Sequence, residues 1–394
     1  MITVAAAKTL LGQHATPMPA KPLPLQDAAG LVLAADVFAP QDIPAFRQSA
    51  MDGYAFAFHN WAGQPLSITA TIPAGHTART TLAAGKAARI FTGAPIPDNA
   101  DTVVIQEKTE VAAAGLHIRD EVIKAGANVR PIGSEARKGA LALAAGTRLT
   151  PAAIGFLATL GLDEVAVHAR PRIQVIVTGN ELQTPGHLLA YGQVYEANSY
   201  TLCAALAQLQ LHNIPVHHAP DHAVHLQAII AAALDTTDVL LLTGGVSVGD
   251  YDYVAQALGN CGVETLFHKV AQKPGKPLFA GRLEDKLVFG LPGNPSSVLT
   301  CFYEYVLPVI EQKMGITYSN VQAQTLVLRN AYQKAAGLTH FLKGQCDAGG
   351  VTLLTGQESY KLHSFAVANC LVQLDADQTS FAAGDPVIVH RLPF

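Results

Sequence analysis

The segment Gly-Leu-Pro-Gly-Asn-Pro-Ser-Ser, residues 290–297, connects an apolar run at 287–291 to an apolar helical pattern at 296–312. The cationic segment Lys-Pro-Gly-Lys-Pro, residues 273–277, precedes it. A buried strand followed by a turn and a helix is the building block of an α/β sheet. The same block can bind a phosphate or another oxyanion. Lysines supply charge, glycines let the backbone approach closely, and the helix offers free N–H groups.

Residues 172–313 repeat this alternation of apolar runs and helical patterns. Strands that alternate with helices pair in parallel in most α/β domains. The sequence therefore predicts an α/β domain with a mainly parallel sheet. We expect its strands at 173–178, 214–219, 238–243 and 287–291, and its helices at 198–209, 222–234, 251–258 and 296–312.

Other patterns flank this region. Residues 1–35 and 150–161 read as helical, and Thr150 before Pro151 is a typical helix start. Short β-like runs between glycine and proline turns predict two small β domains. These runs are 67–72, 87–91, 102–107, 121–123, 351–354 and 386–389. We predict a multidomain α/β protein with a bipartite helical domain at 1–40 plus 136–171, a β-rich inserted domain at 41–135, an α/β ligand-binding domain at 172–315, and a small C-terminal β domain at 316–394.

The composition excludes several classes of protein. The 394 residues are 49% hydrophobic and 14% charged, with a formal net charge of −4. Such a chain can bury large cores and a subunit interface, and nothing in it indicates binding to nucleic acid or to a membrane. The five cysteines are dispersed, the N-terminus lacks a signal-peptide pattern, and no apolar run approaches the ~18–20 residues that span a bilayer. These features predict a cytoplasmic protein with reduced thiols.

Acidic residues follow several of the predicted strands. Ligands of open α/β sheets bind at the carboxyl ends of the strands. Glu181, Asp221 and Asp252 lie in such positions, whereas Asp238 precedes its strand and is excluded. Carboxylates that converge beside phosphate-binding lysines predict a divalent cation, most plausibly Mg2+. The alternative is that Asp221 caps a helix and that Asp252 stabilises a helix dipole.

Three lysines form a second candidate group. Lys269, Lys273 and Lys276 are spaced as on one helix face, but Pro274 and Pro277 prevent a regular helix. We therefore expect an extended or turn segment that directs the lysines toward an anion. The alternative is a solvated basic loop.

Residues 245–249 match the Gly-x-Ser-x-Gly pattern of hydrolase nucleophiles, with Ser247 at its centre. Asp285 and one of three later histidines would complete a triad in the right chain order. No His-Gly-Gly segment lies upstream, however, and the additional Gly244 suits a phosphate loop better. A serine hydrolase is therefore the less favoured reading. The three histidines are His340, His363 and His390.

Four histidines have spacings that resemble those of metal ligands. They accompany neither a glutamate nor a cysteine, so a strand end and a polar helix face explain them better. They are His217, His218, His222 and His225.

Taken together, these motifs identify a known family. The chain resembles the molybdopterin molybdenumtransferases of the MoeA type, which include the E domain of gephyrin. The matching motifs run in family order over nearly the whole chain. They lie at 42–46, 49–55, 90–97, 100–104, 145–149, 178–182, 243–250, 273–277 and 290–295.

The resemblance implies an elongated homodimer whose active site lies between the α/β domain of one subunit and the β domain of the other. The bipartite helical domain would serve in dimerisation. It also implies a reaction in which molybdate and adenylylated molybdopterin are the substrates, Mg2+ is required, molybdenum enters the dithiolene, and AMP is released. A molybdopterin adenylyltransferase and apo-molybdoenzymes would be partners. A catalytically weak binding or scaffold homologue of the same fold is the alternative.

The family motifs also suggest site residues. Those implied to be catalytic are Asp52, Thr92, Glu181, Asp221, Asp252, Lys269, Lys273 and Lys276, with the last three acids as tentative Mg2+ ligands. Those implied to bind the cofactor are Gly244, Gly245, Ser247, Gly249, Pro292, Gly293, Asn294, Pro295, Arg130 and Ser364. The chain departs from the family pattern at Asn180, Ser134, Glu135 and the Arg47-Gln48 pair, and each departure removes or moves a negative charge.

Overall fold

The computed structural model describes residues 1–220, 222–245 and 253–393. The chain divides into two compact units, one formed by Met1–Lys21 together with His168–Phe394 and the other by Pro22–Val167. We call them the large unit and the small unit. The finer division into four parts stays a prediction. No helix in the described part of the chain is long and apolar enough to span a bilayer.

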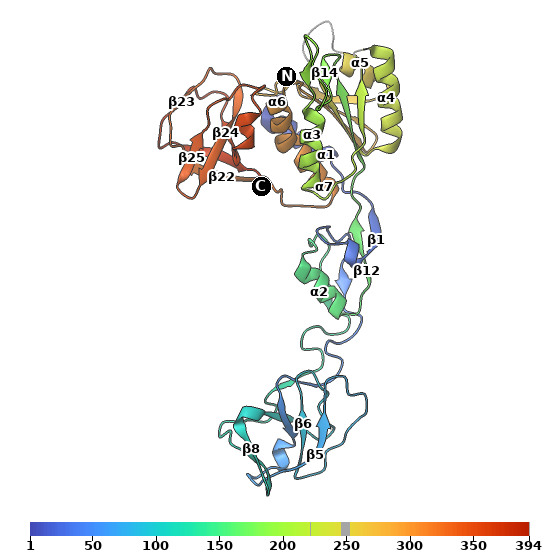
Figure 1. The fold of residues 1–394 in the computed structure, drawn as a ribbon, viewed down its shortest axis with the longest axis vertical. Coiled ribbons are helices and arrows are strands. Elements are labelled where there is room, and N and C mark those ends of the chain that lie inside the picture. Colours follow the sequence, from blue (N-terminus) through green and yellow to red (C-terminus); the bar gives the residue numbers. More distant parts are fainter. Residues whose placement is uncertain (221, 246–252, 394) are drawn as a thin grey trace. The chain divides into compact units, whose positions relative to one another are not determined.

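A six-stranded sheet forms the centre of the large unit (Figure 1). Its first four strands pair in parallel, and the last two join antiparallel. The predicted mainly parallel α/β sheet is therefore confirmed. In spatial order the strands are β16 (Val216–Ala219), β13 (Ile173–Thr178), β17 (Val239–Thr243), β21 (Lys286–Leu291), β20 (Phe279–Leu283) and β18 (Glu264–His268).

Helices cover both faces of this sheet. On one face, α4 (Ala223–Thr236) and α5 (Tyr253–Asn260) pack on the strands, and Leu226 and Ile230 are buried against Leu240. On the other face lie α3 (Asn198–Ala207) and α6 (Pro295–Cys301), as Figure 1 shows. Because helices cover both faces of the sheet, side chains on both faces of each strand are buried. The strands therefore have nearly continuous apolar sequences.

The predicted helix 296–312 forms with an internal irregularity. A π-helical turn at Phe302–Val306 separates α6 from α7 (Leu307–Lys313). Pro308 is the cause, because proline has no N–H to donate and its ring crowds the carbonyl group of Glu304, four residues earlier.

The predicted helix 1–35 is wrong beyond its first third. The α-helical part is α1 (Val4–His14), with the Thr3 side chain accepting a hydrogen bond from the Ala6 N–H at 3.2 Å, and a single 3-10 turn follows at Leu25–Asp27. The chain then continues as Thr-Pro-Met-Pro-Ala-Lys-Pro-Leu-Pro at 16–24, and four prolines in nine residues exclude a helix. Helix α1 belongs to the large unit, where Gln312 Nε2 donates to the Gly12 carbonyl oxygen at 2.9 Å.

The C-terminal part of the large unit is a second sheet. Leu342, Val372 and Val389 form its core. The predicted strands at 351–354 and 386–389 are confirmed. In spatial order the sheet contains β19 (Gln272–Lys273), β24 (Thr339–Asp347), β26 (Cys370–Leu374), β28 (Pro386–Arg391) and β22 (Gln322–Val327), while β25 (Gly350–Leu353) pairs with β24.

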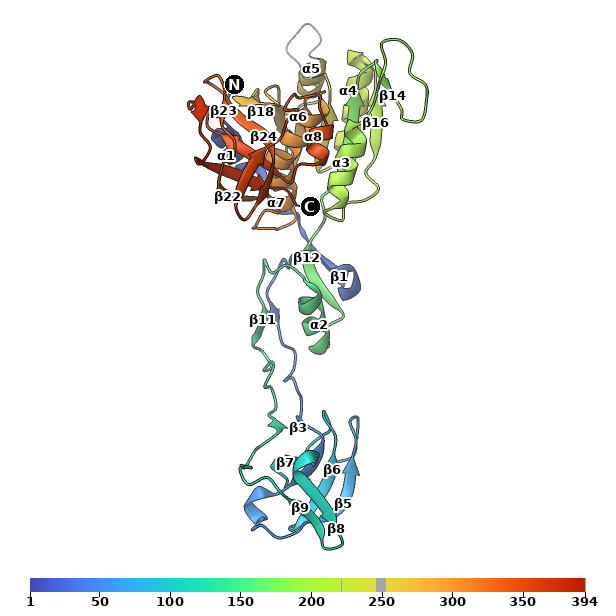
Figure 2. The same cartoon turned by 60° about the vertical axis from the view of Figure 1, so that its left-hand side comes forward.

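The small unit is rich in short strands, as predicted (Figure 2). The predicted helix at 150–161 forms as α2 (Pro151–Thr159), capped by Thr150. The predicted strand 121–123 is wrong, because Asp120 accepts hydrogen bonds from the next residues and closes a turn there. The main sheet has the order β5 (Ser67–Ile72), β6 (Lys86–Ile90), β4 (Gly53–Phe56) and β7 (Thr102–Ile105). Smaller pairs are β8 (Thr109–Ala112) with β9 (Gly115–Ile118), β10 (Val129–Arg130) with β3 (Gln48–Ser49), β11 (Leu141–Leu143) with β2 (Val37–Phe38), and β1 (Ala20–Pro24) with β12 (Glu164–His168) at the boundary of the unit.

Candidate functional site

Two glycines form the turn at the carboxyl end of β17. Gly244 has φ +83°, and a Cβ atom there would lie 2.6 Å from the Thr178 carbonyl oxygen. Gly245 has φ +65°, and a Cβ atom there would lie 2.6 Å from Val254 Cγ2. Only glycine meets both demands without strain. The predicted glycine loop therefore begins with two glycines packed closely against Thr178 and Val254. Ser247 and Gly249 lie outside the described residues.

The loop at 292–295 lies beside this turn. A Cβ atom on Gly293 would be 3.9 Å from Gly244 Cα. The Gly293 carbonyl oxygen accepts a hydrogen bond from Asn198 Nδ2 at 2.9 Å, and Asn294 Nδ2 donates to Ser359 Oγ at 2.9 Å. The two glycine loops that the sequence predicted thus meet at one edge of the sheet. Pro292 ends the strand side of this loop and Pro295 begins α6.

Two buried polar atoms at this edge lack a hydrogen-bond partner among the described residues. They are Thr243 Oγ1 and Asn198 Oδ1. Buried polar atoms are usually paired, so two unpaired atoms beside the glycine turn make this edge a candidate for contact with a polar ligand or a water. Sequence reasoning missed Asn198. Its signal in the sequence was an Asn-Ser pair at the start of a predicted helix. In the structure, no side chain caps this helix.

The predicted metal site can be assessed only in part. Glu181 is exposed and follows β13, and its carboxylate folds back over Gly179, where a Cβ atom would lie 2.8 Å from Glu181 Oε2. Asp221 and Asp252 lie outside the described residues. Among those described, no group of three or more His, Cys, Asp or Glu side chains could hold a metal ion. One hard oxygen donor at the correct edge fits Mg2+, which retains several waters and needs few protein ligands.

The lysine segment forms a turn, as predicted. The Lys269 N–H donates to the Leu278 carbonyl oxygen, and the Val270 N–H donates to that of Lys276, both at 2.9 Å. The turn packs tightly on α6, because a Cβ atom on Gly275 would lie 2.5 Å from Cys301 Sγ. Lys273 and Lys276 are exposed, and Lys269 is half-buried. The segment therefore holds three cations on a rigid frame that is joined to the helix after Pro295.

The charge of Lys273 affects its neighbour in the second sheet. Lys273 is opposite His340 where β19 pairs with β24. Burial, and then the charges of Lys334 and Lys273, lower the pKa of His340 to about 4. This histidine is therefore neutral at physiological pH, and it cannot add a positive charge to the lysine segment.

Sequence reasoning missed a buried lysine that connects the second sheet to helix α6. Lys343, in β24, is 2% exposed. Its Nζ donates to Ser296 Oγ at 3.1 Å, to the Gly356 carbonyl oxygen at 2.8 Å and to that of Lys361 at 3.1 Å. Burial lowers the pKa of Lys343 to about 8. The ammonium group holds the 356–361 loop against the first turn of α6. Its signal in the sequence was a cation within the apolar run Phe-Leu-Lys-Gly.

Ser364 belongs to the same network. Its hydroxyl group donates to the Gly356 carbonyl oxygen at 2.6 Å and lies 3.2 Å from that of Lys361. The residue is buried. These contacts position the loop around Lys343, and the predicted role in cofactor binding stays a prediction.

Asp52 and Thr92 form a pair in the small unit. The Thr92 N–H and hydroxyl groups both donate to Asp52 Oδ1, each at 2.8 Å. These bonds, assisted by the charge of Arg89, hold the pKa of Asp52 below its usual value. Arg89 is fixed in turn, with its guanidinium 5.2 Å from the Tyr54 ring and 4.7 Å from the Phe91 ring. The result is a carboxylate whose ionised form is favoured and whose orientation is fixed by Thr92.

Arg130 lies in the same unit and is exposed. Its strand, β10, pairs with β3, where Val129 is opposite Ser49. The Ser49 carbonyl oxygen accepts from the Gly93 N–H at 2.8 Å, next to Thr92. Backbone pairing therefore links Arg130 to the segment that carries the Asp52–Thr92 pair.

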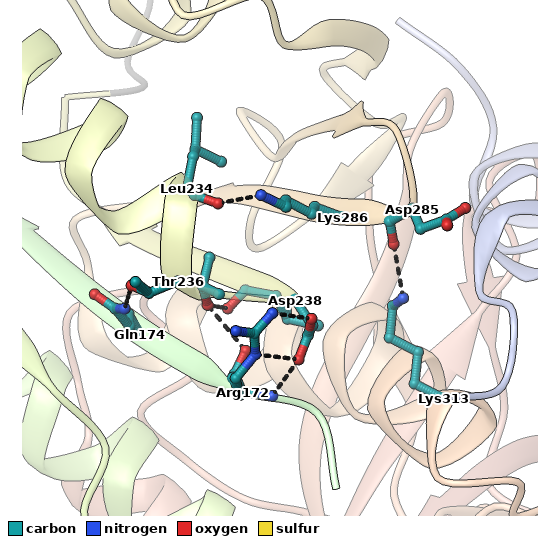
Figure 3. Close-up of polar contacts among 10 residues, drawn as sticks. Arg172, Gln174, Leu234, Thr236, Asp238, Asp285, Lys286 and Lys313 are labelled. Carbon is teal, nitrogen blue, oxygen red and sulfur yellow. Dashed lines mark hydrogen bonds and ion pairs between the residues drawn. The ribbon is translucent and has the colours of Figure 1, made fainter. Parts of the chain in front are cut away.

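The amino edge of the sheet has a different character, and the exclusion of Asp238 is confirmed there (Figure 3). Asp238 is bound by the Arg172 guanidinium through Nη2 at 2.9 Å and Nε at 3.1 Å, and by the Arg172 N–H at 2.7 Å. At the same edge Lys286 Nζ donates to the Leu234 carbonyl oxygen and Lys313 Nζ to that of Asp285. These groups hold the ends of the strands together, and the Asp238 carboxylate is fully used by Arg172.

The position of Asp285 argues against the serine-hydrolase alternative. Asp285 immediately precedes β21 and lies at the amino edge, whereas Ser247 belongs to the loop after the carboxyl end of the parallel strand β17. Among the candidate histidines, His390 Nδ1 is bound to Glu304 Oε1 at 2.7 Å in the interior. A Ser-His-Asp arrangement built on Asp285 is therefore ruled out by the topology.

Comparison with known proteins gives consistent results over the whole chain. Three family models match: the MoeA N-terminal region (domain I and II) at 2–161, a probable molybdopterin binding domain at 174–312, and the MoeA C-terminal region (domain IV) at 325–392. The chain is 32% identical to the molybdopterin molybdenumtransferase of Haemophilus influenzae, over 99% of this chain and 98% of that protein. It is 35% identical to molybdopterin molybdenumtransferase 2 of Mycobacterium tuberculosis, over 94% of each. A crystal structure of a molybdopterin biosynthesis MoeA protein from Pyrococcus horikosii matches with a TM-score of 0.84 and 27% identity, over 99% of both chains.

Proposed function

From its membership of the MoeA family of molybdopterin molybdenumtransferases, to which the chain belongs over its full length, we propose that it inserts molybdenum into molybdopterin. The substrates are molybdate and adenylylated molybdopterin, and AMP is the second product. The enzyme works in molybdenum cofactor biosynthesis, in the cytoplasm. Its scattered cysteines, none of them in a disulfide among the described residues, suit that compartment.

The observation that supports this proposal most directly is the edge formed by Gly244, Gly293 and Asn198. Glycine residues and two unpaired buried polar atoms lie there, at the carboxyl ends of parallel strands. The lysine turn packs on the helix that begins at the same edge. Lysines and backbone N–H groups are the groups that recognise phosphate and other tetrahedral oxyanions such as molybdate.

The chain's own residues would act mainly by position and charge. The lysine segment neutralises the phosphoanhydride and molybdate oxygens, and the glycine loops let these oxygens approach the backbone. Glu181, with Asp221 and Asp252, would hold Mg2+, which would neutralise phosphate charge. The ionised Asp52, fixed by Thr92, accepts a hydrogen bond from a water or a substrate hydroxyl group and holds it in one orientation.

The site residues are distributed over the two units, with Asp52, Thr92 and Arg130 in the small unit and Glu181 and the lysines in the large unit. We therefore also propose the homodimer that the family resemblance implies, in which the small unit of one subunit completes the site of its partner. A molybdopterin adenylyltransferase would supply the substrate, and apo-molybdoenzymes would receive the product.

The test is AMP release from adenylylated molybdopterin, with and without molybdate and Mg2+, for the wild type and Asp52→Ala. Molybdate-dependent release that activates an apo-molybdoenzyme and fails in the variant would support the insertase. Tight substrate binding without release would favour the scaffold alternative, and Asn180 and Glu135 would then be the first residues to restore to the family pattern. Mixing Asp52→Ala with Lys273→Ala tests the shared site, because mixed dimers regain one intact site only if the two residues come from different subunits.

A further inference from the structure

The small unit contains a cavity that is lined by none of the predicted site residues, although parts of two family motifs, 42–46 and 90–97, form some of its wall. Its volume is about 620 Å3, which lies within the range of small-molecule sites in proteins. Asp52, Thr92 and Arg130 do not line it. The walls come from residues 45–47, Ile72 with the 75–80 loop between β5 and β6, residues 95–98, and Ile132.

Two arginines line this cavity. Arg47 and Arg79 belong to its lining, and Asp98 is the one acidic residue of the described lining. Arg47 uses Nη1 to donate to the Ala100 carbonyl oxygen at 2.9 Å, and no other side-chain bond of Arg47 is found in the described part of the chain. Arg79 is exposed, with no side-chain hydrogen bond or ion pair among the described residues. Two guanidinium groups with donors to spare favour a phosphate group.

Apolar groups also line the cavity. Phe46 is 44% exposed and Ile132 is 49% exposed, and both line the cavity. Pro95 and Pro97 add flat apolar surface beside them. An exposed aromatic ring next to guanidinium groups suits a planar heterocycle, which stacks on the ring while its charged substituent meets the cations.

The walls are held in place by hydrogen bonds within the unit. The Ile96 N–H donates to the Arg47 carbonyl oxygen at 3.0 Å, and the Asp98 N–H donates to that of Thr80 at 2.8 Å. His76 Nε2 lies 3.3 Å from Thr80 Oγ1. The arginine-bearing segments on both sides are thus fastened to the same stretch, 96–98, so the cavity does not depend on a ligand for its shape.

We propose that this cavity binds a phosphate-bearing aromatic heterocycle, with Arg47 and Arg79 on the phosphate and Phe46 against the ring. A nucleotide and a pterin phosphate share this chemistry. The inference rests on the cavity and its charges, and it does not require that the chain transfers molybdenum. It also gives a role to Arg47, one of the residues at which the chain departs from the family pattern.

The experiment is isothermal titration calorimetry on the full-length chain carrying Lys273→Ala, which first weakens phosphate binding at the lysine segment. The probes are AMP and neopterin phosphate, each with its unphosphorylated form as control. We expect at least one phosphorylated probe to bind about ten-fold or more tightly than its unphosphorylated form, and to weaken as salt is added. Binding of AMP alone would assign the site to nucleotides, and binding of neopterin phosphate alone to pterins.

Three further variants locate the binding. Arg79→Ala should weaken it about 10- to 100-fold, as expected for loss of a charged hydrogen bond. Ala78→Phe should block it by filling the cavity, and because Ala78 is exposed the fold should be unaffected. Arg119→Ala, whose side chain pairs with Glu110 away from the cavity, should change nothing. The proposal is overturned if neither phosphorylated probe binds below about 1 mM, or if Arg79→Ala and Ala78→Phe bind as tightly as Arg119→Ala. Molybdate-dependent AMP release, measured separately, decides the proposed function independently of this result.

Discussion

Gly244→Ala should destabilise the large unit through two separable effects. At φ +83° an alanine is in the left-handed region, which costs about 1–2 kcal/mol. In addition, its Cβ would lie 2.6 Å from the Thr178 carbonyl oxygen, a backbone atom that cannot rotate away. Overpacking of this kind costs about 1–3 kcal/mol more. Gly192→Ala is the matched control, because Gly192 has φ +87° and no atom within 4 Å of the added Cβ.

Urea unfolding can separate the two units in one experiment. The chain has one tryptophan, Trp61, so its fluorescence reports the small unit. Far-ultraviolet circular dichroism is dominated by helices of the large unit, since α2 is the one long helix found in the described small unit. We expect Gly244→Ala to lower the dichroism midpoint by on the order of 1 M relative to Gly192→Ala. The fluorescence midpoint should not move.

Equal dichroism midpoints for Gly244→Ala and Gly192→Ala would refute the reasoning, because the close approach to Thr178 would then cost nothing. A parallel shift of the Trp61 transition would refute the assignment of the effect to the large unit. The same variant should also lose affinity for AMP, since the displaced turn no longer presents its backbone at the edge of the sheet.

Three further predictions concern individual charges. Thr92→Val removes one of the bonds that lower the pKa of Asp52, so the acid limb of the AMP-release profile should move to higher pH, whereas Thr92→Ser should keep it. The ordinary lysine pKa near 10.5 falls to about 8 for Lys343 in the folded chain, so the unfolded state binds more protons between these values. Wild type should therefore gain stability relative to Lys343→Met as pH rises from 8 to 10, and a constant difference in urea midpoint would contradict this. Asp238→Ala should cost only about 0.2–1 kcal/mol, because water can solvate the exposed Arg172 side chain that loses its partner, and AMP release should be unchanged; a large loss of activity would place Asp238 in the site after all.

The parallel sheet could be predicted from the sequence because both of its faces are covered. Burial on both faces makes a strand apolar at nearly every position, as in residues 239–242 of β17 (Val239–Thr243), and such runs stand out between helical patterns. The antiparallel strands β20 and β18 carry glycine and charged residues and gave no such signal. Their place in the sheet depends on tertiary pairing.

The N-terminal prediction failed for a physical reason that was present in the sequence. The apolar residues Val32 and Leu33 are buried, but they lie in β-bridges to Arg148 and Val167 and not in a helix. Periodicity alone cannot distinguish these cases over a short stretch. The prolines at 17–24 carried the more decisive information.

The parts of the candidate site that lie in glycine motifs could be predicted from the sequence. The parts formed by residues outside any motif could not. Gly244 and Gly293 belong to recognisable motifs, and the structure brings them together. Asn198 and Lys343 belong to an ordinary helix start and an ordinary strand. Their importance arises from burial next to those motifs, which depends on how segments distant in sequence pack.

The two edges of the parallel sheet differ in how their polar groups are satisfied, and this difference is itself an argument for where the chemistry occurs. At the amino edge, Asp238 is paired with Arg172, and two lysine ammonium groups reach carbonyl oxygens (Figure 3). At the carboxyl edge, Thr243 Oγ1 and Asn198 Oδ1 have no partner in the described chain, and two successive residues adopt positive φ. Unpaired buried polar atoms reduce stability, and they persist at functional sites where a ligand can pair with them. Because these atoms lie beside glycine turns at the carboxyl ends of parallel strands, where ligands of open α/β sheets bind, this is the edge at which we expect substrate to bind.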